Sequence, residues 1–75
     1  MFLVIELQKT GDTVANLVTQ HATALEAESK FHTVLGYAAV SAVDVHSAVL
    51  MDEKGFVYRS ESYDHTTPAE EPAEE

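Results

Sequence analysis

Residues 2–9 are rich in large apolar side chains and are interpreted as a strand, in which successive side chains point alternately to two opposite faces. The two sets separated by this alternation are Leu3, Ile5 and Leu7 on one face and Phe2, Val4, Glu6 and Gln8 on the other. Gly11 and Asp12 follow, and both residue types are typical of a tight turn. The pattern therefore predicts that residues 2–9 form the first strand of a hairpin.

Residues 13–21 are compatible with two structures. A helical stripe of period 3.6 runs from Val14 to Leu25, and it would extend the next helix towards the N-terminus. A second stripe over residues 27–38 is rotated from the first by about 110°, since each residue advances ~100°, so one straight helix cannot bury both. Several β-branched residues also favour a strand. We therefore expect a strand over residues 13–20, with a longer helix as the alternative.

Thr23 and Glu26 mark the start of a helix. Their spacing is that of a capping box, in which the Thr23 side chain accepts from the Glu26 amide and Glu26 reaches back to the Thr23 amide. The pattern predicts a helix from residue 24 to about residue 40. Gly36 lies inside it and costs about 1 kcal/mol relative to alanine. We therefore expect a packing reason for Gly36, namely the close approach of another element.

A second hairpin is expected near the C-terminal end of the body. Residues 43–51 return to near alternation, residues 52–55 interrupt the pattern with a glycine, and residues 56–63 are rich in aromatic and β-branched types. Together the segments predict an α+β fold in the order ββαββ, hairpin, helix, hairpin. It is an antiparallel four-stranded sheet with one helix packed on one face.

Residues 1–65 are expected to form this single domain, and residues 66–75 a disordered acidic tail. The tail contains no bulky apolar residue that could offset its chain entropy. Of the formal net charge of −9, four negative charges belong to the tail and the remaining −5 to the body. The four Lys and Arg residues cannot neutralise a row of phosphates, so we expect no direct binding to nucleic acid or to anionic membranes.

Cysteine is absent, which excludes disulfides, a thiol nucleophile and a thiolate zinc site. A cytoplasmic location fits this composition best. The apolar run over residues 2–5 has no basic residue before it and meets Glu6 at once, so we interpret it as a strand rather than a signal peptide or a membrane span.

The small size of the domain predicts a partner. A chain of this length buries only about 60% of the surface that its unfolded state exposes, and it has no disulfide to compensate. The strand patterns place apolar residues on both faces of the sheet, whereas one helix covers one face. We therefore expect a homodimer, or a complex with another protein, through the uncovered face. The interface residues expected are Phe2, Val4, Val18, Val49 and Tyr58, although a one-residue slip in register would exchange the faces.

Two constellations could carry chemistry. Glu28 and His32 stand four residues apart on one helical face, which could serve a metal ion but is more typical of a solvated electrostatic pair. His46 lies near Asp44 and Ser47, but neighbours in a strand point to opposite faces, so a catalytic triad is not expected. His46 is instead interpreted as a half-exposed strand residue. We expect no enzyme activity, no cofactor and no metal.

Three segments, residues 27–32, 38–41 and 45–49, resemble a group of short uncharacterised bacterial proteins from prophage-type gene neighbourhoods. The resemblance implies a small accessory or structural protein of a mobile element, and it transfers no catalytic motif. Two other functions stay open: an acidic mimic of nucleic acid that inhibits a host enzyme, and a small metal-binding protein or enzyme. A mimic requires a regular row of carboxylates, whereas an assembly module requires an apolar patch.

Overall fold

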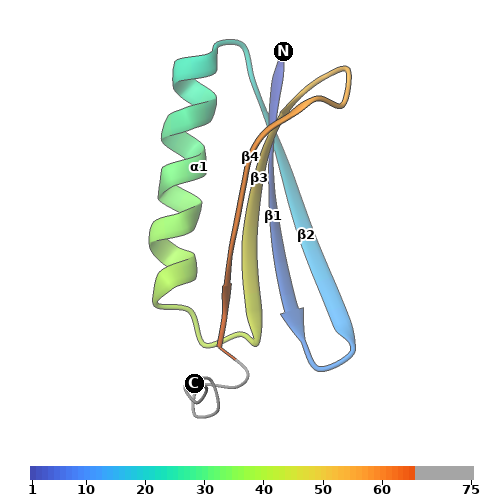
Figure 1. Cartoon of the computed structure of the whole chain (residues 1–75), viewed down its shortest axis with the longest axis vertical. Helices are drawn as coiled ribbons and strands as arrows, with labels where there is room; N and C mark the ends of the chain where they lie inside the picture. Colours follow the sequence, from blue (N-terminus) through green and yellow to red (C-terminus); the bar gives the residue numbers. More distant parts are fainter. Residues whose placement is uncertain (66–75) are drawn as a thin grey trace, which may run out of the picture.

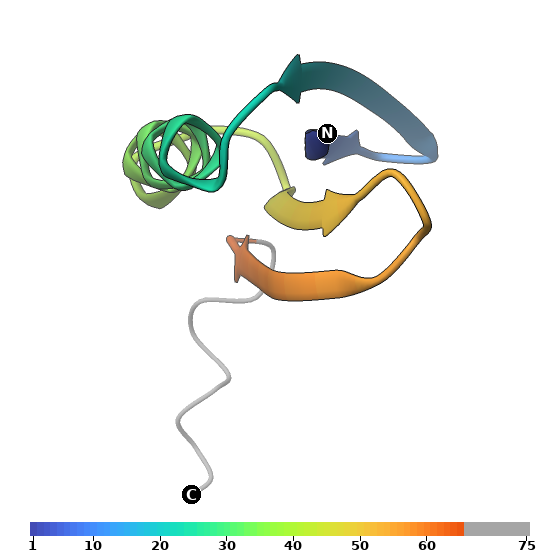
Figure 2. The same ribbon diagram turned by 90° about the horizontal axis from the view of Figure 1, so that it is seen from above.

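The computed structural model describes residues 1–65 and confirms the predicted α+β fold. The elements in chain order are β1 (Phe2–Thr10), β2 (Thr13–His21), α1 (Ala24–Ala39), β3 (Val45–Asp52) and β4 (Val57–Asp64). They form one antiparallel sheet in the order β2-β1-β3-β4, and α1 lies along one side of it (Figures 1 and 2). The segment predicted to be a disordered tail, residues 66–75, lies outside the described residues.

The junction between β2 and α1 settles the choice that the sequence left open. Residues 13–21 pair with β1 as a strand from Thr10↔Thr13 to Phe2↔His21. Thr23 is extended, with φ −124° and ψ 156°, and its hydroxyl accepts from the Glu26 amide at 3.2 Å. The hydroxyl thus satisfies one of the free amides of the first turn, so α1 begins at Ala24.

Both hairpin turns use a glycine with positive φ, Gly11 at 61° and Gly55 at 94°. The second turn is also held by Asp52, whose Oδ1 accepts from the amides of Lys54 at 2.8 Å and Phe56 at 3.0 Å. The hydrogen bond from the Phe56 amide is the main cause that lowers the pKa of the Asp52 carboxyl below its ordinary range. These contacts are those of an Asx-type turn.

The core lies between α1 and the two central strands. Ala27 and Ala38 of α1 and Ala48 of β3 are fully buried, and small side chains at these positions allow the helix to approach the sheet closely. Phe31, 1% exposed, fills the space between the layers. The other buried apolar residues are Val4, Val34 and Leu50. Among the described residues, no helix is long and apolar enough to cross a membrane.

Gly36 departs from the expectation of close packing. It lies on the exposed side of α1, and a Cβ built there would meet no atom within 4 Å. The buried stripe of the helix is carried by Ala27, Phe31, Val34 and Ala38 instead. Within residues 1–65 no element therefore uses Gly36 for close approach, and the expected packing reason was wrong.

A β-bulge changes the register between β3 and β4. The pairing passes from Leu50↔Arg59 to Met51↔Val57, which leaves Tyr58 as the extra residue. The Tyr58 hydroxyl donates to Asp52 Oδ2 at 3.2 Å, and loss of solvent together with this bond raises the pKa of Tyr58 above its ordinary range. Its ring centroid lies 5.9 Å from that of Phe2. Tyr58 is therefore placed beside Phe2 by a bulge that simple alternation does not predict.

Candidate functional site

The sheet has two faces of different character, defined by strand register and burial. The covered face packs against α1 and contains the buried residues of the central strands, Val4 of β1 and His46, Ala48 and Leu50 of β3. The open face carries no helix (Figure 2). Cross-strand pairing assigns it the following side chains on β1 and β3: Leu3, Ile5, Leu7, Lys9, Val45, Ser47, Val49 and Met51.

The open face is apolar at its centre. Ile5 pairs with Val18 on one side and with Val49 on the other, so three aliphatic side chains adjoin across β2, β1 and β3. The next row, towards the β3–β4 turn, contains Leu3, Met51 and Val57. Val18 and Val57 on the edge strands are 48% and 47% exposed. This face is therefore a contiguous aliphatic patch that no part of residues 1–65 covers.

The five residues expected at an interface do not share one surface. Val18 and Val49 lie on the open face, as cross-strand partners of Ile5. Val4 is 1% exposed beneath α1, so it cannot contact a partner, and the expectation for Val4 was wrong. Phe2 alternates with Leu3 and packs against the same core as Val4, and Tyr58 lies beside Phe2 through the bulge. Phe2 and Tyr58 therefore belong to the covered side.

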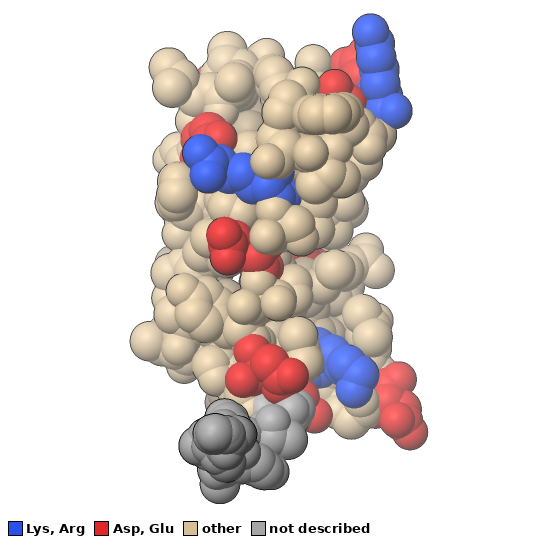
Figure 3. Space-filling model, in the orientation of Figure 1, with Lys and Arg blue, Asp and Glu red and all other residues tan. Residues whose placement is uncertain are grey.

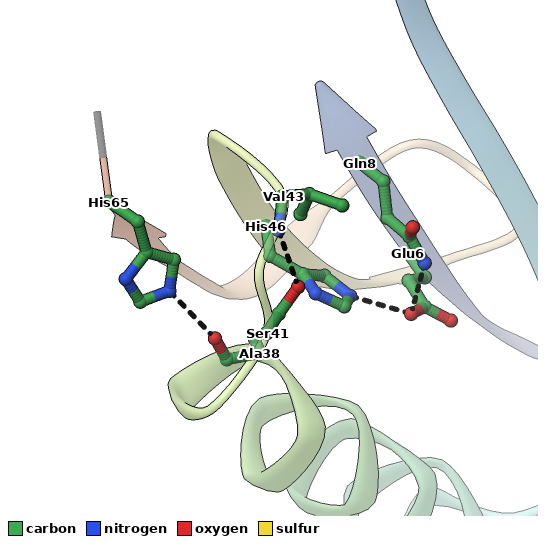
Figure 4. Close-up of polar contacts among 7 residues, drawn as sticks. All are labelled: Glu6, Gln8, Ala38, Ser41, Val43, His46 and His65. Atoms are coloured by element: carbon green, nitrogen blue, oxygen red, sulfur yellow. Dashed lines mark hydrogen bonds and ion pairs between the residues drawn. The ribbon is translucent and has the colours of Figure 1, made fainter. Parts of the chain in front are cut away.

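A polar cluster lies within the covered face, near the C-terminal end of α1 (Figure 4). His46 Nε2 lies 2.6 Å from Glu6 Oε2, and Gln8 Nε2 donates to the same carboxylate oxygen at 3.0 Å. The side chains of His46 and Glu6 are 5% and 16% exposed. An ionised carboxylate only accepts, so Nε2 carries the proton that His46 donates. Two donors therefore fix the Glu6 carboxylate.

His46 departs from the expected half-exposed position. The residue is 4% exposed, and its Nδ1 is buried without a hydrogen-bond partner in the described part of the chain. Asp44 is engaged elsewhere, because its Oδ2 accepts from the Gly11 amide at 2.8 Å. Ser47 lies on the opposite face, as expected from alternation. The partner of His46 is Glu6, 40 residues away, and local sequence patterns could not identify it.

A small hollow of about 120 Å³ lies beside Glu6. Glu6 and Gln8 of β1 line it together with Ala15, Asn16 and Leu17 of β2. Glu6 is the cross-strand partner of Leu17, and Gln8 is the partner of Ala15. The hollow therefore lies on the covered side of the sheet, over the edge strand β2. The sequence shows one weak sign of this site, the acidic Glu6 in an otherwise apolar strand.

The pair considered for metal binding lies on the helix surface. His32 Nε2 lies 3.5 Å from Glu28 Oε1, and Arg59 of β4 donates to Glu28 Oε2 at 2.9 Å. His32 and Arg59 have side chains more than half exposed. Within residues 1–65, no three His, Asp or Glu side chains are placed to share one metal ion. Glu28 therefore holds β4 to α1.

No protein-family model, curated protein or solved structure matches this chain. Its function is therefore inferred from the open face of the sheet and from the cluster around Glu6.

Proposed function

We propose that this protein is a non-enzymatic protein-interaction module that forms a homodimer through the open face of its sheet. The observation that carries the proposal is the distribution of side chains along β1. The face beneath the helix includes Glu6 and Gln8, whereas the open face carries Leu3, Ile5 and Leu7. A more apolar face that residues 1–65 leave uncovered is typical of an interface.

The charge pattern favours a second copy of this chain as the partner. In a twofold dimer each patch meets a copy of itself, so a patch with many like charges would repel its copy. The body carries a net charge of −5, yet Lys9 and Asp64 are the only charged residues that the strand register assigns to the open face within residues 1–65. They have opposite signs and lie in the row farthest from the aliphatic centre.

The size of the face agrees with a small dimer interface. Four strands spaced ~4.8 Å apart and eight residues long at ~3.3 Å per residue cover about 500 Å². Two such faces give a total of about 1,000 Å², which is close to the smallest area expected for a specific interface. Sheets that pack face to face bury aliphatic side chains in this way.

The charges of the described residues give less support to a nucleic-acid mimic. A mimic needs carboxylates in a regular row, but most carboxylates here have local partners. Asp44 and Asp52 hold loops, Glu28 pairs with Arg59, and Glu53 pairs with the N-terminal amine at 3.1 Å. On the face that Figure 3 displays, acidic and basic groups are interspersed. We further propose a place in an assembly of a mobile element, which is what the resemblance to proteins of prophage-type neighbourhoods implies.

Sedimentation equilibrium across a range of concentrations tests the dimer. The wild-type protein should approach twice its chain mass of 8.2 kDa at micromolar concentration. Val18→Lys should weaken dimerisation at least 100-fold, because it places a charge in the aliphatic patch. Val18 is on an edge strand and already 48% exposed, so the monomer should keep its fold, as checked by circular dichroism.

Tyr37→Lys is the matched control. Tyr37 is a large apolar residue on α1 that is 67% exposed, away from the open face. This variant should dimerise like the wild type. A wild-type protein that stays monomeric at high concentration would overturn the proposal, as would equal weakening by both variants.

A further inference from the structure

The hollow beside Glu6 follows from how the helix crosses the sheet. α1 packs against β3 and β1, through residues such as Phe31 and Val34, and leaves much of β2 uncovered. On β2 the small side chain of Ala15 lies next to Leu17, which is 56% exposed. Ala15 therefore leaves room above the strand. The aliphatic side chain of Leu17 and the acidic residue Glu6 both line this space.

The carboxylate is held in place before any ligand arrives. His46 and Gln8 both donate to Oε2 of Glu6, which leaves Oε1 as the oxygen that can accept from a ligand. His46 is itself locked by burial beneath α1. Because the side chain of Glu6 is only 16% exposed, a charge interaction there is screened less than at the open surface.

We propose that this hollow binds a primary alkylammonium group, with the cationic head on Glu6 and the aliphatic stem along Leu17 and Ala15. The ammonium supplies donors to Oε1, and the stem removes part of the exposed Leu17 surface from water. The net charge of −9 raises the local concentration of cations around the molecule. The group can come from a small free amine or from a lysine side chain of another protein.

The volume limits the length of the stem. A cavity of about 150 Å³ is known to admit benzene, with six heavy atoms, so the 120 Å³ here accommodates about four or five heavy atoms. This matches n-butylammonium and the end of a lysine side chain. It is too small for an aromatic amine to enter fully.

NMR titration of the ¹⁵N-labelled protein with n-butylammonium chloride tests the site, with sodium chloride at equal ionic strength as the reference. We expect saturable shifts confined to the amides of β1 and β2 around Glu6, Gln8 and residues 15–17. A second titration uses the peptide acetyl-Gly-Lys-Gly-amide. Saturation by both ligands indicates a site open to lysine side chains, and saturation by butylammonium alone indicates a site for free amines.

Three variants decide whether the hollow itself binds. Glu6→Gln keeps an acceptor for His46 but removes the charge, and it should weaken binding at least tenfold. Ala15→Val should weaken binding similarly, because it fills the hollow without altering Glu6. Glu61→Gln is the matched control, since Glu61 lies across the same row of the sheet, opposite Ala48, but on the exposed strand β4.

The proposal requires that Glu61→Gln binds like the wild type. Shifts that spread over all acidic residues, or that survive both Glu6→Gln and Ala15→Val, would overturn it in favour of general attraction to an acidic surface. The absence of saturable shifts would also overturn it. The hollow lies on the opposite side of the sheet from the proposed dimer interface, so these outcomes are independent of the oligomeric state.

Discussion

The two faces of the sheet reverse the usual distribution of side chains. In a two-layer domain the more apolar face normally packs against the helix. Here the covered face contains the polar residues Glu6, Gln8 and His46. On the open face, by contrast, strand β1 by itself contributes three aliphatic residues. On the covered face, Gln8 and His46 Nε2 contact the Glu6 carboxylate, whereas His46 Nδ1 is buried without a partner within residues 1–65. Within residues 1–65 nothing covers the aliphatic side chains of the open face, and our proposal is that a partner supplies the second layer.

The largest difference between the two faces should be in the free energy of unfolding that is lost when a side chain is changed. Phe31→Ala removes the largest buried side chain of the covered side, and the lost burial plus the remaining cavity should lower the free energy of unfolding by about 3 to 5 kcal/mol. Val18→Thr on the open face keeps a β-branched residue at an exposed position, and it should change stability by less than about 0.5 kcal/mol in dilute, monomeric protein.

Urea denaturation at low protein concentration measures both changes. Comparable effects of Phe31→Ala and Val18→Thr would contradict the distinction between a face that holds the fold and a face that the fold of the single chain does not need. If the proposed dimer forms, the effect of Val18→Thr should increase at higher protein concentration, because the native state is then linked to the interface.

The Glu6–His46 pair should show coupling of intermediate size. Glu6→Leu leaves His46 buried and without its hydrogen bond, which should cost about 1 to 3 kcal/mol. The double variant with His46→Leu removes both polar groups and should recover much of this loss, because apolar replacements of a buried pair are often neutral. A double-mutant cycle by urea denaturation should give a coupling energy of about 1 to 2 kcal/mol. Additive effects would show that the pair does not act as a unit.

Local chemistry predicted the elements, but not the assignment of faces. Thr23 and Glu26 fixed the start of α1, and Gly11 and Gly55 lie in the turns expected of them. The helix covers the face that carries His46, Ala48 and Leu50 of β3. The residues of β1 that share this face are set by pairing between strands that are distant in the sequence. Alternation along β1 alone cannot decide it, because Phe2 and Val4 are apolar as well.

The candidate sites were harder to predict for the same reason. Glu6 and His46 are 40 residues apart and meet only because β1 and β3 are neighbours in the sheet. Tyr58 lies beside Phe2 because a bulge adds one residue to β4, and bulges carry no clear signal in this sequence. The hollow depends on the position of α1 relative to β2, which no local pattern specifies.

A smaller effect is expected at the start of α1, the element that makes the two faces different. Thr23→Ala removes the hydroxyl that accepts from the Glu26 amide at 3.2 Å, and it should lower the free energy of unfolding by about 1 kcal/mol. Thr33→Ala is the control, because its hydroxyl donates to the Ser29 carbonyl within the exposed helix surface, where alanine is a better helix former. Thermal unfolding should show a clear loss of melting temperature for Thr23→Ala alone.

An effect of the opposite sign, a modest gain in stability, is expected at Gly36. A Cβ at this position meets no atom within 4 Å, and alanine in a helix interior is favoured over glycine by about 0.8 to 1 kcal/mol. Gly36→Ala should therefore raise the free energy of unfolding by about 0.5 to 1 kcal/mol, measured by urea denaturation. Gly11→Ala is the contrasting change: the space is equally open, but a φ of 61° is unfavourable for alanine, so this variant should be less stable than the wild type. A loss of stability in Gly36→Ala would contradict this expectation. It would indicate that the exposed side of α1 contacts another part of the protein or a partner, in addition to the buried stripe that packs against the sheet.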